Sequence, residues 1–97
     1  MTNFKASKKY GIYSIEVDGH ATGSDSVCAG ISALCYALMG VADNSDALIV
    51  ESMNVYDGHF DMCWRGGIEA KTAFNMITIG LSQIAQSYPD YCRGAIN

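Results

Sequence analysis

The segment Met53–Met62, MNVYDGHFDM, carries the clearest fold signal in the sequence. Asp-Gly between two runs of alternating apolar residues is typical of a two-residue β-hairpin, since a type I′ turn needs positive φ at both central positions. We therefore predict a type I′ turn at Asp57-Gly58, which joins a strand within Ala47–Tyr56 to a strand within His59–Arg65.

The register of this hairpin separates its residues into two faces, because successive side chains of a strand point to opposite sides of a sheet. Tyr56 is expected opposite His59, and Val55 opposite Phe60. One predicted face carries Met53, Val55, Phe60, Met62 and Trp64, and the other carries Asn54, Tyr56, His59, Asp61 and Cys63.

A second pair of strands is predicted near the N-terminus. The segment Ile12–Val17 is rich in β-branched and aromatic residues in alternation with polar ones, which is typical of a strand. We expect Asn3–Ser7 to pair with it as a short edge strand, across a turn at Lys8–Gly11.

Two amphipathic helices are predicted, one after each hairpin. Apolar residues recur three or four positions apart from Ser26 to about Ala42 and from about Glu69 to Tyr88, where Pro89 ends the pattern. The first stripe is Val27, Ile31, Leu34, Leu38 and Val41, and the second is Ala70, Phe74, Ile77, Leu81, Ile84 and Tyr88. The order β-β-α-β-β-α favours an α+β fold with two helices packed on one face of a largely antiparallel sheet. We expect residues 1–97 to form a single domain.

The composition argues against several functional classes. With 49% hydrophobic residues, 16% charged residues and one proline, the chain has the apolar content of a folded domain. Six basic residues against ten acidic ones leave a net charge of −4, which argues against nucleic-acid binding and is compatible with a basic protein or peptide as partner. We recognise no signal peptide and no uncharged apolar run of membrane-spanning length, so we expect a cytoplasmic protein with no membrane association.

The four cysteines are Cys28, Cys35, Cys63 and Cys92, which we expect to be reduced in the cytoplasm. Cys28 and Cys35 lie seven positions apart in the first predicted helix, which separates them by about 10 Å along its axis. A disulfide requires Cα atoms within about 7 Å, so this pair is not bridged.

Cys28 and His20 form the candidate catalytic pair. With Ser24 or Asp25 as N-cap, Cys28 falls in the first helical turn, where free N–H groups and the helix dipole favour a thiolate and suit an oxyanion. His20 ends the preceding strand only eight residues earlier, so a single loop returns it toward the sulfur. Taken singly, Cys28 also fits a small buried residue, and His20 a strand-end residue bonded to backbone. Together they provide the nucleophile and base that thiol catalysis requires.

Three residues near this pair have two interpretations each. Asp25 is a helix cap or a group that orients His20, and its negative charge beside the thiol favours the cap. Ser32 lies one turn after Cys28, where its hydroxyl contacts the sulfur or substrate, or more simply bonds a carbonyl of its own helix. Gly23 is a hinge in the loop Ala21–Ser24, which we expect to be mobile until a peptide binds, or part of a fixed turn.

A zinc site is the alternative chemistry, because His20, Cys28, His59 and Cys63 together supply a Cys₂His₂ ligand set. His59 and Cys63, however, lie about 13 Å apart along a regular strand. One ion cannot bind both, so we expect no metal and no cofactor.

Several motifs together resemble the signature of the ribosomal-processing cysteine protease (Prp) family. They are Gly19-His20-Ala21, then Gly23 and Asp25, and the run Val27–Leu34, VCAGISAL. The closing segment Gly80–Tyr91, GLSQIAQSYPDY, is similar to the C-terminal helix and the Tyr-Pro-acid-Tyr ending of that family. The interval from His20 to Cys28 is shorter than is usual, and Gly30 stands where alanine is more common. The chain thus resembles a divergent or phage-encoded member.

This resemblance implies a homodimeric cysteine endopeptidase that removes a short N-terminal extension from a ribosomal protein, or acts on a phage structural protein. It also implies that His20 is the base and Cys28 the nucleophile, with Asp25 and Ser32 at motif positions. The alternative from another class is a non-catalytic dimeric protein-interaction module of the same fold, in which Cys28 is unreactive.

Overall fold

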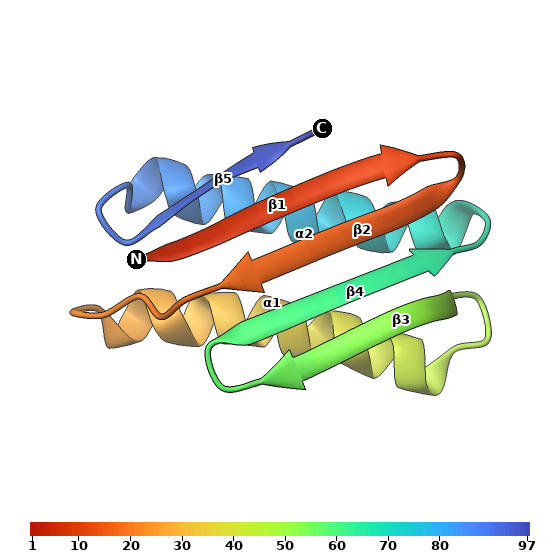
Figure 1. The fold of residues 1–97 in the computed structure, drawn as a ribbon, viewed down its shortest axis with the longest axis horizontal. Coiled ribbons are helices and arrows are strands. Elements are labelled where there is room, and N and C mark those ends of the chain that lie inside the picture. The colour runs from red at the N-terminus through yellow and green to blue at the C-terminus, as the bar shows by residue number, and fades with distance from the viewer.

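Two β-hairpins, each followed by a long helix, make up most of the chain (Figure 1). The computed structural model describes all 97 residues. Its elements are β1 (Thr2–Lys9), β2 (Ile12–Asp18), α1 (Asp25–Asn44), β3 (Ile49–Tyr56), β4 (His59–Arg65), α2 (Ile68–Ser87) and β5 (Cys92–Ile96). The predicted elements are all present, with ends that differ by one to two residues in most cases.

The five strands form one sheet in the order β3-β4-β2-β1-β5. The two hairpins join through an antiparallel ladder between β2 and β4, and β5 adds to the free edge of β1 in parallel. The predicted fold class is confirmed. The expectation that the first strand lies at an edge is wrong, because the unpredicted strand β5 covers it (Figure 1).

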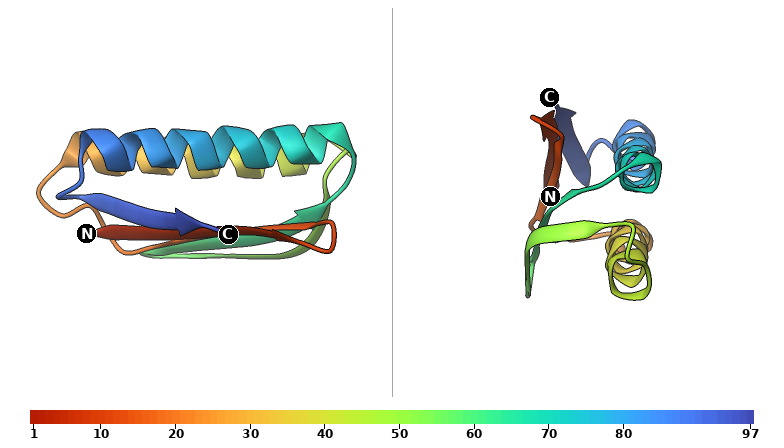
Figure 2. Two further views of the ribbon diagram at one scale, coloured as in Figure 1. Left: turned by 90° about the horizontal axis from the view of Figure 1, so that it is seen from above. Right: turned by 90° about the vertical axis from the view of Figure 1, so that its right-hand side faces the viewer.

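Both helices pack side by side on one face of the sheet, and the other face is open (Figure 2). The alternation of the strands explains this arrangement, since the residues that point toward the helices are apolar. The buried apolar residues of β1, β2 and β4 are Phe4, Ala6, Tyr13, Ile15, Val17, Phe60, Met62 and Trp64, whereas β3 has no buried residue. Thr2 of β1 is a buried polar residue. The two predicted faces of the β3–β4 hairpin are confirmed by its register, in which Val55 pairs with Phe60 and Tyr56 with His59.

The buried stripes of the helices differ in detail from the predicted ones. In α1, Cys35 is buried, whereas Leu34 lies against Gly80 of α2 and Val41 is exposed. The packing of one helix beside another turns Leu34 toward its neighbour and leaves the small Cys35 under the sheet. Tyr88, expected in the second helix, is instead the residue that caps it.

The type I′ turn lies in the first hairpin, not in the second. Tyr10 and Gly11 both have positive φ, of 54° and 77°, whereas in the Asp57-Gly58 turn only Gly58 does. The prediction of a type I′ turn at Asp57 is therefore wrong, although the two-residue connection and its register are right.

Helix α1 is long and apolar enough to cross a membrane by length and composition alone. The sequence expectation rested on uncharged runs alone, and the uncharged segment between Asp25 and Asp43 is shorter than a membrane span. In this fold α1 packs on the sheet through Val27, Ile31 and Leu38. A core helix of this kind meets the same criterion.

We predict that Tyr10→Asn stabilises the protein. The backbone of Tyr10 has φ 54°, which is strained for a tyrosine. Its side chain is fully exposed, so no packing contact compensates for this strain. Asparagine tolerates this conformation, and we expect a gain of about 0.5–1 kcal/mol in the free energy of unfolding. Thermal unfolding followed by circular dichroism measures it. Gly11→Ala is the opposing control and should destabilise, and an unchanged melting temperature for Tyr10→Asn would contradict the analysis.

Candidate active site

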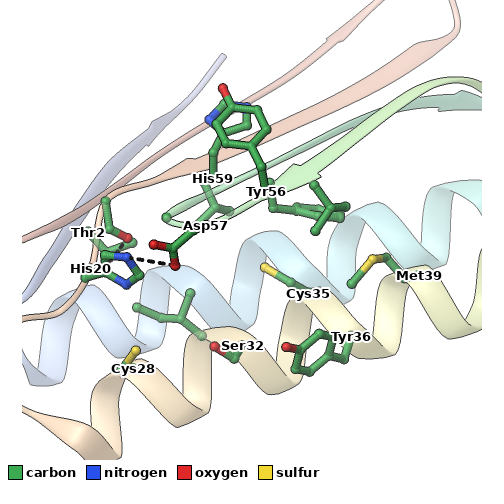
Figure 3. A pocket seen from close by; sticks show the side chains of 16 residues that line it. Thr2, His20, Cys28, Ser32, Cys35, Tyr36, Met39, Tyr56, Asp57 and His59 are labelled. Atoms are coloured by element: carbon green, nitrogen blue, oxygen red, sulfur yellow. Dashed lines mark hydrogen bonds and ion pairs between the residues drawn. The ribbon is translucent and has the colours of Figure 1, made fainter.

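A cavity of about 350 Å³ lies between α1 and the ends of β2 and the β3–β4 hairpin (Figure 3). Its polar and reactive lining includes His20, Cys28 and Ser32, three of the residues that the sequence singled out. Its apolar lining includes Val55 from β3 and Met39 from α1. The cavity thus extends from the candidate catalytic pair along the groove between α1 and the edge strand.

Cys28 is placed by the first turn of α1. Ser24 is the N-cap, and its hydroxyl oxygen accepts a hydrogen bond of 3.3 Å from the Val27 N–H. The Cys28 N–H donates to the Ser24 carbonyl at 3.1 Å, which is the first bond of the helix. Asp25 and Ser26 therefore keep backbone N–H groups without a helical partner. The Cys28 side chain is half-buried and lines the cavity.

His20 lies on the opposite wall, beyond the end of β2. The Gly19 N–H donates to the Gly58 carbonyl at 2.7 Å, which fixes the end of β2 against the hairpin turn. A Cβ atom at Gly58 would lie 3.1 Å from His20 Nε2, so the ring rests directly on this turn. His20 Nε2 lies 3.5 Å from Asp57 Oδ1, and 56% of the His20 side chain is exposed.

The structure brings His20 and Cys28 to the same cavity but forms no hydrogen bond between them (Figure 3). Catalytic hydrogen bonds are often long in enzymes without substrate and shorten when substrate binds. A proton transfer between the two groups requires the imidazole and the thiol to approach.

The other candidate residues have distinct places. Ser32 lines the cavity one turn from Cys28, and its hydroxyl makes no bond to its own helix, contrary to the simpler interpretation. Asp25 is the first helical residue rather than the cap and does not line the cavity. Gly23 has φ 96° in a turn closed by a bond from the Ser24 N–H to the Ala21 carbonyl. The supporting role of Asp25 and the hinge role of Gly23 stay predictions.

Sequence reasoning treated Asp57 only as a turn residue and missed its place beside His20. The residues are far apart in sequence, and only the pairing of β2 with β4 brings them together. The register of the Asp57-Gly58 hairpin was available from the sequence, but the partner strand of β4 was not. No local signal could therefore have found this contact.

The zinc alternative is not formed in this structure. Cys63 pairs with Ser14 on the open face, where the two side chains are 3.2 Å apart. His59 is engaged by two carboxylates on the open face, and Cys28 belongs to α1, which lies in the helix layer on the other face. The four proposed ligands do not converge.

The four cysteines are all free, as predicted, and their surroundings differ. Burial raises the pKa of Cys35 to about 11. Burial also raises the pKa of Cys92, which lies in β5. Desolvation opposes the charged thiolate in both cases, so these two thiols are held in the unreactive form. Cys28 and Cys63 are the two partly accessible cysteines.

The family model for the cysteine protease Prp matches residues 1–93 of this chain. The chain belongs to the cysteine protease Prp family. This membership confirms the resemblance drawn from the sequence motifs and the prediction of a cysteine protease. No curated protein was matched by sequence.

Solved structures share the Prp fold over the whole chain. The ribosomal processing protease Prp from S. aureus, in complex with a covalently linked product peptide, has 22% identity and a TM-score of 0.82, with 100% of both chains covered. The same S. aureus protease with a substrate peptide has 21% identity and a TM-score of 0.78, again with 100% of both chains covered. SMU.848 from Streptococcus mutans has 24% identity and a TM-score of 0.77, over 99% of this chain and 93% of that one. These likenesses establish the fold.

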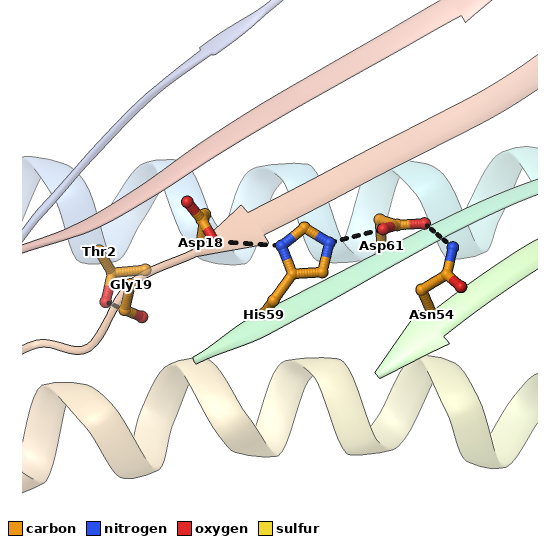
Figure 4. Close-up of polar contacts among 6 residues, drawn as sticks. All are labelled: Thr2, Asp18, Gly19, Asn54, His59 and Asp61. Atoms are coloured by element: carbon orange, nitrogen blue, oxygen red, sulfur yellow. Dashed lines mark hydrogen bonds and ion pairs between the residues drawn. The ribbon is translucent and has the colours of Figure 1, made fainter. Parts of the chain in front are cut away.

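A polar network on the open face of this Prp-family sheet supports the two segments that hold His20 and Asp57 (Figure 4). His59 lies between two carboxylates, with Nδ1 3.1 Å from Asp18 and Nε2 2.6 Å from Asp61. Asn54 also donates to Asp61, and the Tyr56 ring stacks on His59 with centroids 4.6 Å apart. The network ties the end of β2 to the start of β4.

We predict that His59 makes the stability of the protein depend on pH. Its hydrogen bonds with Asp61 and Asp18 raise the His59 pKa above its ordinary 6.5. The hydrogen bond with His59, and then that with Asn54, lowers the pKa of Asp61 below its ordinary 3.8. The histidine contribution is therefore complete below pH 6.5 and lost as pH rises through the raised value, and the Asp61 contribution is lost as pH falls below 3.8 through the lowered one.

Urea unfolding of wild type and His59→Gln across pH tests this dependence. The stability difference between the two proteins should be largest between about pH 4 and 6.5 and should shrink in alkaline buffer. A difference that stays constant from pH 5 to pH 9 would show that His59 acts through packing alone.

Proposed function

We propose that this protein is an endopeptidase that cleaves a peptide segment with Cys28 as nucleophile and His20 as general base. The observation that carries the proposal is the shared cavity, which Cys28 enters from the start of α1 and His20 from the end of β2. Membership of a cysteine protease family supports it. The inert surroundings of Cys35 and Cys92 leave Cys28 as the only partly accessible thiol in this cavity.

In the first half of the reaction, Cys28 gives its proton to His20, and Sγ attacks the scissile carbonyl carbon. The C–S bond forms, and the carbonyl oxygen becomes an oxyanion. When the intermediate collapses, the C–N bond breaks and the imidazolium of His20 gives its proton to the leaving amine. The product of this half is a thioester on Cys28 with a free amine.

In the second half, water replaces the amine in the cavity. His20 takes a proton from the water while the water oxygen attacks the thioester carbon. The C–S bond then breaks, the carboxylic acid leaves, and the proton on His20 returns to the Cys28 sulfur. Both protein groups are restored, and one peptide bond has been hydrolysed.

The N-terminus of α1 is suited to stabilise the oxyanion. Helical side chains lean toward the N-terminus of their helix, so the Cys28 sulfur is directed toward the first turn. There the N–H groups of Asp25 and Ser26 have no helical partner. Ser32, whose hydroxyl faces the cavity unbonded, is placed to contact the bound peptide.

The substrate we propose is the N-terminal extension of a ribosomal protein, or a structural protein of a phage. A ribosomal protein binds RNA and is therefore rich in Lys and Arg. The net charge of −4 on this chain favours such a basic partner over nucleic acid. Processing of a newly made ribosomal protein places the reaction in the cytoplasm.

We further propose a homodimer, supported by the apolar outer surface of the helix layer. Val41 of α1, with Met76 and Ile79 of α2, are large apolar residues left exposed. A small apolar hollow lies between the two helices. Sedimentation equilibrium at micromolar concentration should give twice the chain mass of 10.4 kDa. A mass near that of one chain would contradict the proposal.

We predict that Cys28→Ala abolishes cleavage and leaves the fold intact, because Cys28 is only half-buried and makes no side-chain hydrogen bond. His20→Ala should lower the rate by about 100-fold or more, since the leaving amine then lacks its proton donor. Mass spectrometry of protein N-termini, in cells that make wild type or Cys28→Ala, identifies the substrate as the one N-terminus that is lost. An identical set of N-termini from a folded Cys28→Ala protein would end the proposal.

Alkylation with iodoacetamide provides the matched control. At neutral pH wild type and Cys63→Ser should each take up one label rapidly, whereas Cys28→Ala should take up none at that rate. Equal and slow labelling of Cys28 and Cys63 would indicate an unreactive Cys28 and a protein-interaction module instead.

A further inference from the structure

We propose that Asp57 is a positioning residue for His20, whose imidazolium it stabilises after the proton leaves Cys28. The inference rests on the proposed function. It also assigns the two ring nitrogens, since Nε2 faces Asp57 and Nδ1 is left to exchange the proton with Cys28.

The separation of His20 Nε2 from the Asp57 carboxylate indicates that Asp57 interacts with the protonated imidazolium rather than with the neutral imidazole. His20 Nε2 and Asp57 Oδ1 are 3.5 Å apart, within the range of an ion pair but without hydrogen-bond geometry. Charge attraction tolerates such a separation, whereas a neutral hydrogen bond weakens steeply. The carboxylate therefore acts when His20 becomes an imidazolium, which is the state reached during catalysis.

No other carboxylate in the structure competes for His20. Asp18 and Asp61, the acidic residues nearest along β2 and β4, are both engaged by His59 on the open face. Asp25 of α1 makes no ion pair with His20. Asp57 is the only acidic residue among those that line the cavity.

The main chain holds Asp57 at this position. The bond from the Gly19 N–H to the Gly58 carbonyl joins the residue before His20 to the residue after Asp57. The His20 ring lies so close to Gly58 that a Cβ there would come within 3.1 Å of Nε2. Main-chain contacts alone therefore fix the turn against the His20 ring. The turn in this position places the Asp57 carboxylate at the Nε2 edge of the ring.

The expected size of the effect is modest. The Asp57 side chain is 99% exposed, so water and salt screen its charge. Exposed ion pairs change equilibria by about two- to fivefold. The interaction should fade at high salt, because the screening length falls from about 10 Å at 0.1 M to about 3 Å at 1 M.

The rate of Cys28 alkylation by iodoacetamide tests the proposal without a known substrate, since the imidazolium of His20 is the counter-ion of the reactive thiolate. At low ionic strength Asp57→Asn should react about two- to fivefold more slowly than wild type at neutral pH. In 1 M NaCl the two rates should converge. Asp57→Glu keeps the charge and should recover much of the rate. Asp46→Asn removes an exposed carboxylate outside the cavity and should match wild type.

The outcomes separate this proposal from the proposed function. If His20→Ala alkylates at the wild-type rate, His20 does not activate Cys28, and the dyad itself fails. If His20→Ala is slow but Asp57→Asn reacts like wild type at low salt, the dyad stands and Asp57 has no role. A loss in Asp57→Asn that is equal at low and high salt would overturn the electrostatic role in favour of turn geometry.

Discussion

The antiparallel ladder between β2 and β4 is the contact on which the rest of the structure depends. Each hairpin forms between neighbouring segments of the chain, and this ladder alone joins the two. Its helix-facing pairs include Ile15 with Met62 and Tyr13 with Trp64, so the best-buried part of the core lies on it. The ladder ends at the pair of Asp18 and His59. Because His20 follows the end of β2 and the Asp57-Gly58 turn directly precedes β4, the same register that closes the core also brings His20 to this turn.

The sequence predicted what is local and missed what depends on distant pairing. Alternation and an Asp-Gly turn determined the faces and register of the β3–β4 hairpin, since both are properties of neighbouring residues. The strand β5 was missed because its partner β1 lies at the other end of the chain. Its five residues also include Gly94, a poor strand former that is needed here because a Cβ atom would clash with the Phe4 ring. The stripe of α1 was misjudged at Leu34 and Cys35, because periodicity cannot tell a helix that faces a sheet from one that also faces a second helix.

The candidate site shows the same division. His20 and Cys28 were found because one short loop joins them. A short loop keeps its two ends close together, however the strand and the helix are arranged in the fold. Asp57 belongs to the other hairpin, so its place beside His20 follows from the β2–β4 ladder and from nothing in the local sequence. The four cysteines also could not be sorted by sequence. Their reactivity depends on burial, which separates Cys35 under the sheet from Cys28 at the cavity wall.

Several contacts hold the loop between β2 and α1, and they limit how His20 and Cys28 can approach each other. Ala21 is buried, the Ser24 N–H bonds the Ala21 carbonyl, and the Ser24 side chain caps the helix. Each of these contacts fixes the start of α1 relative to the end of β2. The His20 ring, by contrast, contacts Gly58 and is more than half exposed. Rotation of the imidazole and thiol keeps these contacts, whereas the predicted movement of the Ala21–Ser24 loop would have to break them. A bound peptide that excludes water from the cavity would strengthen the attraction between the rotated ring and Asp57, because charges interact more strongly when they are desolvated.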